Sequence, residues 1–322
     1  MAEPRSSAIQ PSTRGQVAET PAPRRVRSRL LTVEQRRWLF CYLGLLPILG
    51  LFIILRVVPI VRTFALSLYE GSIVAPQSQF VGLTNYLNLL QDINFQTALK
   101  NTTLFALIIV SLGVTVGLGL ALLMDQRFRL SPLYETLYFL PYITPMVPVA
   151  MIWKWIYDPS YGLLNYILSW FGMSPVGWLV YPNIALWSIA MMSVWKIVGY
   201  NMIIFLVGLR NIPVVYYEAA AIDGARGPQA LRYITLPLLK PIILFVLVVN
   251  TIGAYNVFTQ VYVMTAESSG SAANTVRVMV YDIWENAFRY FRMGYASAEA
   301  VILFVIILLL TLVQFRLIRT ED

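Results

Sequence analysis

The sequence predicts an all-α, polytopic membrane protein with about six transmembrane helices. Two observations lead to this fold class. Hydrophobic residues make up 58% of the 322 residues and charged residues only 12%, whereas about 25% of a typical soluble domain is charged. Several apolar runs also reach about 20 residues, the length with which an α-helix crosses a hydrocarbon core of roughly 30 Å.

The first element in the chain is a tail over residues 1–37, rich in Pro, Ser and Arg. A segment of this composition cannot bury enough apolar surface to fold, so we predict a disordered basic tail. It is too long and too basic for a cleaved signal peptide. We assign residues 38–322 to one transmembrane domain.

The apolar runs of this domain predict six spans, and an even number of spans leaves both termini on one side of the membrane. Lysine and arginine are concentrated in cytoplasmic loops. Of the 24 such residues, 16 lie in the tail, in the loops on the side of the termini or at the C-terminal end, and 4 lie in the opposite loops. The termini are therefore predicted to be cytoplasmic. The predicted spans are 38–60, 103–124, 137–157, 184–209, 241–263 and 296–317.

The cytoplasmic loop 210–240 has an unusual sequence for a loop between apolar spans. It contains EAAAIDGARG, of which Glu218–Ala221 are strong helix formers. Asp223 and Gly224 follow as a turn signal, because glycine accepts backbone angles that other residues resist. We therefore predict a helix that ends in a turn at Gly224.

A second short helix is predicted from Ala225, with an apolar side at Leu231, Ile234 and Leu236, until Pro237 and Pro241 end it. The resulting helix–turn–helix would lie at the membrane surface. Its small residues allow either a partner protein or the protein's own bundle to approach closely, and the residues alone leave both interpretations open.

Unusual polar and aromatic residues occur inside the predicted spans. A charge within a span is costly and must face a cavity or a partner. Amides can both donate hydrogen bonds to hydroxyl groups and accept them, so this set suits a neutral polyol, although hydrogen bonding between helices is the alternative. The candidate pathway residues are Trp195, Lys196, Tyr200, Asn201, Asn250, Tyr255 and Asn256.

Other residues in the spans are interpreted more simply. Arg56 and Lys154 are expected to reach toward the membrane interface, beside the aromatic belt residues Trp153 and Trp155. Prolines in the third span each remove a helix donor or create a kink, which serves packing or shapes a pathway. These are Pro141, Pro145 and Pro148.

Several function classes fit the sequence poorly. The single cysteine, Cys41, excludes an internal disulfide framework, and the lack of histidine argues against a zinc site or histidine-based catalysis, so no metal is expected. The basic charge follows the topology, so no nucleic acid is expected. A secondary transporter needs a carboxylate deep in a span, but only Glu299 comes near, expected at the outer end of the last span.

The loop 210–240 resembles the EAA motif of the permeases of bacterial ABC importers. Glu218-Ala219-Ala220, Asp223-Gly224-Ala225, Ile234-x-Leu236-Pro237 and Pro241 match it, while Leu231 departs from the usual pattern. Further stretches resemble the branch that imports sugars and glycerol phosphate, including the F subunit of maltose permeases. They are Phe80-Val81-Gly82-Leu83-x-Asn85-Tyr86, Asn101-Thr102, Leu140-Pro141 with Trp153, Tyr161-Gly162-Leu163-Leu164-Asn165 and Gly294-Tyr295-Ala296.

The resemblance implies a type I ABC importer permease fold in a bacterial inner membrane. It implies that the loop is a coupling helix held by a cytosolic ATPase, with the residues Glu218, Ala219, Ala220, Asp223, Gly224, Ala225 and Pro237. The implied partners are a second permease, two ATPase subunits, an external solute-binding protein and membrane lipid. The chain has no phosphate-binding loop of its own, so it is not the ATPase, and ATP and Mg²⁺ are expected on the partner. No clustered acid, base or metal set appears either, so the chain is not expected to be an enzyme.

The resemblance leaves the cargo open. The expected function is to form half of a pathway for a sugar or related polyol. Import of glycerol phosphate or of an amino acid by the same machinery is the alternative, because the EAA loop reports on the coupling and says little about the cargo.

Overall fold

The structure is a computed structural model that describes residues 33–71, 79–126, 130–225, 227–265 and 276–317. The predicted tail lies outside the described residues except for residues 33–37, which begin the first helix. The described chain divides into two compact units, one ending at Arg56 and the other beginning at Val57. All sites discussed below lie in the second unit.

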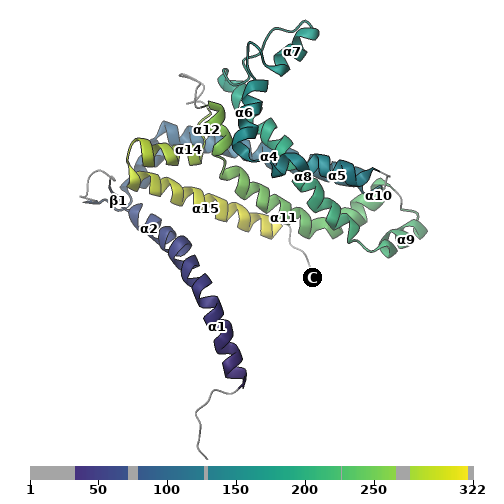
Figure 1. The fold of residues 1–322 in the computed structure, drawn as a ribbon, viewed down its shortest axis with the longest axis horizontal. Coiled ribbons are helices and arrows are strands. Elements are labelled where there is room, and N and C mark those ends of the chain that lie inside the picture. The colour runs from purple at the N-terminus through teal and green to yellow at the C-terminus, as the bar shows by residue number, and fades with distance from the viewer. Residues whose placement is uncertain (1–32, 72–78, 127–129, 226, 266–275, 318–322) are drawn as a thin grey trace, which may run out of the picture. The chain divides into compact units, whose positions relative to one another are not determined.

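Almost all described secondary structure is helical (Figure 1), which confirms the predicted fold class. The only described strands, β1 and β2, have two residues each and pair antiparallel, with Tyr69 opposite Phe80. In chain order the elements are α1 (Val33–Phe52), η1 (Ile53–Val57), α2 (Val58–Leu66), β1 (Tyr69–Glu70), β2 (Gln79–Phe80), α3 (Thr84–Gln91), α4 (Ile93–Met124), α5 (Ser131–Ile143), α6 (Met146–Ile156), α7 (Leu163–Trp170), α8 (Pro182–Arg210), α9 (Val214–Ile222), α10 (Pro228–Ala230), η2 (Leu231–Thr235), α11 (Leu236–Tyr255), α12 (Thr259–Thr265), α14 (Met279–Trp284), η3 (Glu285–Arg289) and α15 (Met293–Leu317).

Six predicted spans correspond to five long apolar helical stretches and one bent pair of helices among the described residues. The bent pair is α5 and α6, whose axes differ in direction by 96°. The five stretches cover Arg37–Leu66, Ile93–Met124, Asn183–Arg210, Pro228–Thr265 and Met293–Leu317.

The second span begins ten residues earlier than its predicted start at residue 103, because α4 extends outward from Ile93. This first part carries polar residues such as Lys100, which hydropathy alone does not assign to a span. The start is fixed by Asp92, whose side chain accepts a hydrogen bond of 2.8 Å from the backbone N–H of Asn94. Such N-caps satisfy a donor that the first turn of a helix leaves free.

The expectation that Pro237 and Pro241 end the second short helix is wrong. The π-helical turn η2 continues directly into α11, in which Pro237 occupies the first turn and Pro241 lies inside. The N–H of Leu236 donates to the carbonyl of Leu231, so the missing N–H of Pro237 falls at an irregular turn of a helix that continues past it. The predicted span 241–263 is instead α11 followed by α12, with a break after Tyr255.

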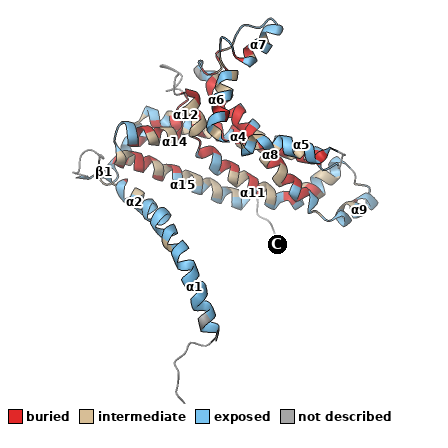
Figure 2. Ribbon diagram, in the orientation of Figure 1, coloured by how far each residue is buried: buried red, intermediate tan, exposed pale blue. Residues whose placement is uncertain are grey.

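The core lies where α8 packs against α4 and α11, and Figure 2 shows buried residues along these helices. Large side chains such as Phe105, Phe205 and Met192 are almost completely buried there. Glycines let α4 and α8 approach closely, since a Cβ atom at Gly117 would lie 2.7 Å from Cβ of Asn201. Helix α8 is therefore held from several sides, and it leads directly to the loop that carries the EAA residues.

Candidate functional site

The EAA residues lie on α9, which begins at Val214, three residues being left between it and the end of α8 at Arg210. Helix α9 ends in a Schellman arrangement, in which the N–H of Ala225 donates to the carbonyl of Ala220 over 2.8 Å and that of Gly224 donates to Ala221 over 3.2 Å. Gly224 has a φ of +83°, where side chains with a Cβ are strained. The predicted turn at Asp223 and Gly224 is present.

One face of α9 is open to solvent and the other packs on the protein itself. Glu218, Ala219 and Asp223 are exposed. Ala220 is buried in its own chain, and its role in contact with an ATPase stays a prediction. On the packed side, the hydroxyl groups of Tyr217 and Thr235 lie 3.0 Å apart and join α9 to η2.

Several large apolar side chains of this loop are exposed, including Val214 and Val215 at the start of α9, and two are exposed more strongly. Ile222 is 87% exposed and Tyr233 is 71% exposed. Sequence reasoning missed both, although Ile222 was visible as a large apolar residue among alanines in EAAAID. We call these two residues and the exposed Glu218 the coupling face. Several exposed apolar residues in one short loop make it a candidate protein interface.

The mid-membrane candidate Lys196 lies on α8 beside the bend between α5 and α6. Its ammonium group donates to the backbone carbonyls of Pro141, Tyr142 and Thr144 over 2.8, 3.2 and 2.5 Å. The residue is only 8% exposed. Lys196 therefore meets neutral carbonyl oxygens of its own protein.

Aromatic rings surround this bend. The rings of Tyr142 and Tyr200 stack with their centroids 4.4 Å apart, and those of Trp153 and Trp195 lie 5.4 Å apart. We call these four residues the aromatic strip. Trp195 is 45% exposed and lines an apolar cavity of about 870 Å³ between α4, α5 and α8. The apolar wall of this cavity is a surface against which a ring-shaped cargo or a second subunit can pack.

The other predicted pathway residues do not join this strip. Asn201 and Asn250 have no exposed surface, and their amide groups have no hydrogen-bond partner among the described residues. Tyr255 is buried, and its hydroxyl donates to Thr103 Oγ1 over 3.3 Å. Asn256 is exposed at the end of α11. Contact of these residues with a cargo stays a prediction, and it would require the bundle to open.

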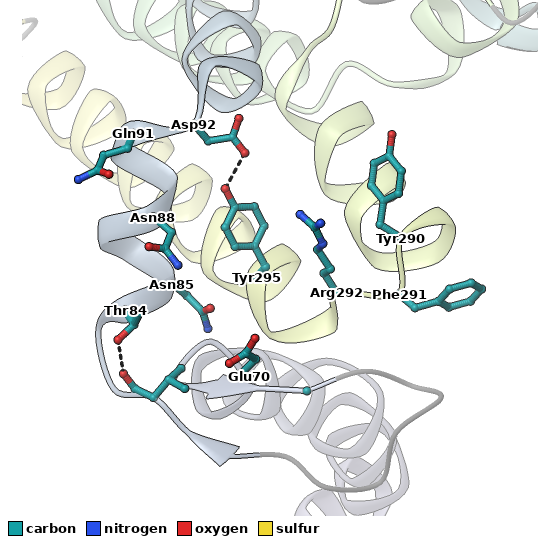
Figure 3. Close-up of a pocket in the computed structure, with 12 residues that line it drawn as sticks. Glu70, Thr84, Asn85, Asn88, Gln91, Asp92, Tyr290, Phe291, Arg292 and Tyr295 are labelled. Atoms are coloured by element: carbon teal, nitrogen blue, oxygen red, sulfur yellow. Dashed lines mark hydrogen bonds between the residues drawn. The ribbon is translucent and has the colours of Figure 1, made fainter.

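A second cavity, of about 680 Å³, lies at the end of the bundle where α3, the start of α4 and the start of α15 meet (Figure 3). Tyr295 closes one side by donating a hydrogen bond of 2.7 Å to Asp92. Glu70 and Arg292 both point into the cavity, and neither makes an ion pair within the described residues. Its lining is therefore polar and carries both charges.

Beside this cavity, a buried ionic cluster fixes α14 and η3 on α15. Arg277 pairs with Asp282 and lies 2.6 Å from Glu285. Burial alone would lower the pKa of Arg277, but its hydrogen bonds and attraction to the two carboxylates raise the pKa overall. Burial raises the pKa of Asp282. Glu299, expected at the outer end of the last span, is fully buried and accepts a 2.8 Å hydrogen bond from Asn286.

Known proteins identify the family of the chain. Residues 113–320 match the family described as "Binding-protein-dependent transport system inner membrane component", a range that includes both α9 and Lys196. The chain belongs to this family. The predicted permease identity is thereby confirmed, and the permease is a multi-pass inner membrane protein with several apolar spans.

Relatives with assigned names cover most of this permease. It is 35% identical over 281 residues to the trehalose/maltose transport system permease protein MalF of Thermococcus litoralis, covering 86% of this chain and 93% of the relative. It is 34% identical to the sn-glycerol-3-phosphate transport system permease protein UgpA of Yersinia pseudotuberculosis, covering 76% and 82% of the two chains.

Solved structures share the fold of the permease. A bacterial ABC transporter involved in the import of the acidic polysaccharide alginate matches with a TM-score of 0.77 at 26% identity, covering 88% of this chain and 96% of the other. The alginate transporter in complex with an alginate pentasaccharide-bound periplasmic protein matches with a TM-score of 0.78 at 25% identity, covering 91% and 100%.

Proposed function

We propose that this permease forms half of the translocation pathway of an ATP-driven importer and is coupled to a cytosolic ATPase through the coupling face on α9 and η2. The observation that carries the proposal is the position of α9. It begins directly after α8, ends at a fixed turn, and exposes Glu218 and Ile222. A partner that binds this face would move α8 with it.

The partners follow from this arrangement. One permease with one coupling face engages one ATPase, so a second permease and a second ATPase complete the machine. ATP and Mg²⁺ bind to the ATPase subunits, and this chain holds neither. The distribution of lysine and arginine supports cytoplasmic termini and therefore a cytosolic location of α9. Apolar side chains on the outside of the spans contact lipid.

An external solute-binding protein delivers the cargo in this proposal. A solved structure with the same fold is in complex with a periplasmic protein. The polar cavity around Glu70 and Arg292 lies at the opposite end of the bundle from α9 (Figure 1), on the side where such a protein would dock.

The cargo that fits best is a neutral sugar or related polyol. Aromatic faces pack on the C–H faces of sugars, and the aromatic strip offers them beside the bend. The named relatives include a trehalose/maltose permease and a glycerol-phosphate permease. A phosphate ester would need a cation within reach, and Lys196 is engaged with carbonyl groups.

Reconstitution tests the proposal. The permease would be purified with the second permease, ATPase and binding protein encoded beside it, and placed in proteoliposomes with ATP inside. We expect one copy of each permease, two ATPase copies, and uptake of a neutral glycoside that depends on the binding protein. A stable, active complex with this permease alone would contradict the heterodimer. Uptake of glycerol phosphate without uptake of any glycoside would favour the alternative cargo.

A further inference from the structure

The bend between α5 and α6 leaves backbone carbonyls without their normal helical donors. In an α-helix the carbonyl of residue i accepts from the N–H of residue i+4. Pro145 has no N–H, so the carbonyl of Pro141 lacks that donor, and Thr144 lies between α5 and α6, where no helical donor reaches its carbonyl. The carbonyl of Tyr142 lies in the last turn of α5, whose last four carbonyls have no partner within the helix.

Side chains provide hydrogen-bond donors to the carbonyls at this bend. The hydroxyl group of Thr144 donates to the carbonyl of Leu140 over 3.0 Å. The three donors of the Lys196 ammonium group reach the carbonyls of Pro141, Tyr142 and Thr144. An ammonium group has three donors and no acceptor, so its capacity is used completely. A positive charge is also favourable at the C-terminal end of a helix.

Two more contacts on the same face of α8 hold α5 at this place. Gly199, three residues after Lys196, lies so close to α5 that a Cβ atom there would be 1.8 Å from the carbonyl oxygen of Tyr138. Tyr200 stacks on Tyr142. Near the other end of α5, Arg210 pairs with Glu135 over 2.7 Å. Helix α5 is therefore fixed to α8 at its bend and again near the start of α9.

From these contacts we propose that Lys196 is a positioning residue, the clamp that fixes the broken third span to α8. It makes α5 and α8 one rigid unit, which carries movement of α9 to the aromatic strip, and it is unavailable to an anionic cargo. The inference rests on the proposed function and adds to it the route of coupling and a preference for uncharged cargo. Unsatisfied carbonyls would otherwise face the interior of the membrane, where each costs free energy.

The first test replaces Lys196 in the complete transport complex. Lys196→Met keeps the length of the side chain and removes all three donors, so we expect a lower thermal midpoint of the purified complex and uptake reduced by about tenfold or more for neutral and anionic cargo alike. Lys196→Arg keeps donors and should retain part of the uptake. Lys100→Met, which changes an exposed lysine on α4, is the matched control and should match the wild type.

The outcomes separate the clamp from a cargo-binding role. If Lys196→Met keeps its thermal midpoint and its uptake of a neutral glycoside, and loses only uptake of a phosphate ester, the clamp is wrong and Lys196 binds the cargo. Wild-type activity of Lys196→Met toward both cargoes would also overturn it. If the wild-type complex transports nothing, the proposed function fails instead.

A second test does not depend on the folding of Lys196→Met. Glu135 and Arg210 are changed to cysteine in a Cys41→Ser chain, and a short bifunctional thiol reagent links them. If α5 and α8 move as one unit, the linked complex should take up cargo at the rate of the unlinked one. Uptake that stops on linking and returns when a cleavable linker is cut would show that the helices slide past each other, and the rigid unit would be wrong.

Discussion

The coupling loop and the bend of the third span are both built around prolines and glycines, but their stabilising contacts have different ranges in the sequence. In α9 the turn is closed by Ala220, Gly224 and Ala225, which lie within six residues of each other. At the bend, Lys196 reaches carbonyls that are 52 to 55 residues away along the chain. A local motif can be replaced or copied as a unit, whereas the bend depends on two helices that meet in space.

This difference predicts that substitutions at the bend damage the fold, while substitutions at the loop damage coupling and leave the fold intact. The exposed coupling face has few contacts with its own protein, so its loss costs little stability. Four predictions test this comparison.

The largest effect is expected for Gly199→Ala. Its Cβ atom would lie 1.8 Å from the carbonyl oxygen of Tyr138 and 2.5 Å from the carbonyl carbon, so α5 or α8 must shift. Overpacking of this kind costs about 1–3 kcal/mol or more. We expect a strongly reduced thermal midpoint and little assembled complex in detergent. Gly119→Ala on α4 has open space around its Cβ atom and serves as the control. Equal midpoints for the two variants would show that the contact at the bend is not tight.

The second effect is expected for Gly224→Val. No atom lies within 4 Å of its Cβ position, so the cost comes only from its φ of +83°. A β-branched residue pays about 1–2 kcal/mol in this conformation, whereas asparagine is tolerated there. Because α9 is exposed, the strain should be relieved by local unwinding of the turn, so the complex should insert with little change in its thermal midpoint but lose stimulation of ATP hydrolysis by loaded binding protein. Gly224→Asn should retain most of that stimulation. If Gly224→Val and Gly224→Asn stimulate ATP hydrolysis equally, the conformation of the turn does not determine coupling.

The third effect concerns the coupling face itself. Ile222→Ser and Glu218→Ala should each weaken binding of the ATPase by about 1–2 kcal/mol, roughly tenfold, because few residues at an interface carry most of its energy. Titration of the purified ATPase onto the permeases in nanodiscs measures this. Val207→Ser, which changes an apolar residue exposed on α8, is the control. If both variants bind the ATPase with wild-type affinity, the loop is not the ATPase contact, and the alternative that it packs only on its own bundle is favoured.

Sequence reasoning succeeded where the signals are local. The apolar runs predicted the spans, and Asp223 and Gly224 predicted the turn, because hydropathy and backbone angles act within a few residues. The start of α4 was missed because its polar first turns carry no hydropathy signal, although Asp92 marks an N-cap. The prolines of α11 were overinterpreted, because Pro237 falls beside the π-helical turn η2 and Pro241 is tolerated inside the apolar helix.

In the candidate site, too, the features set by local sequence were predictable and those set by packing were not. The position of the coupling face was predictable, but the burial of Ala220 and the exposure of Ile222 depend on how α9 rotates against η2. The spacing of Pro141, Pro145 and Pro148 indicated a kink. The role of Lys196 as the donor to these carbonyls could not be predicted. It depends on how α8 packs on α5, and the periodicity of the sequence does not encode that packing.

The smallest effect separates the two kinds of polar residue buried in the bundle. Lys196 has a partner for each donor, whereas the amide of Asn250 has none among the described residues and lies beside Gly113, whose Cβ position is 3.7 Å from Nδ2. Replacing an unpartnered polar group by an apolar group of similar size is nearly neutral or stabilising. We therefore expect Asn250→Leu to leave the thermal midpoint unchanged or to raise stability by about 1 kcal/mol.

The control for this variant is a buried amide that is fully engaged. Asn165 donates to the carbonyl of Val176 over 2.9 Å and accepts from the indole N–H of Trp178 over 3.0 Å, so Asn165→Leu should lower the midpoint by several degrees. If Asn250→Leu lowers the midpoint as much as Asn165→Leu does, the amide of Asn250 makes stabilising hydrogen bonds in the assembled complex, and the prediction is wrong. If the midpoint of Asn250→Leu holds but uptake stops, the amide acts when the bundle opens, as the predicted pathway role requires. If uptake by Asn250→Leu is unchanged, Asn250 does not contact the cargo, because loss of a contacting amide would leave hydroxyl groups of the cargo without hydrogen bonds. The aromatic strip would then remain as the predicted contact.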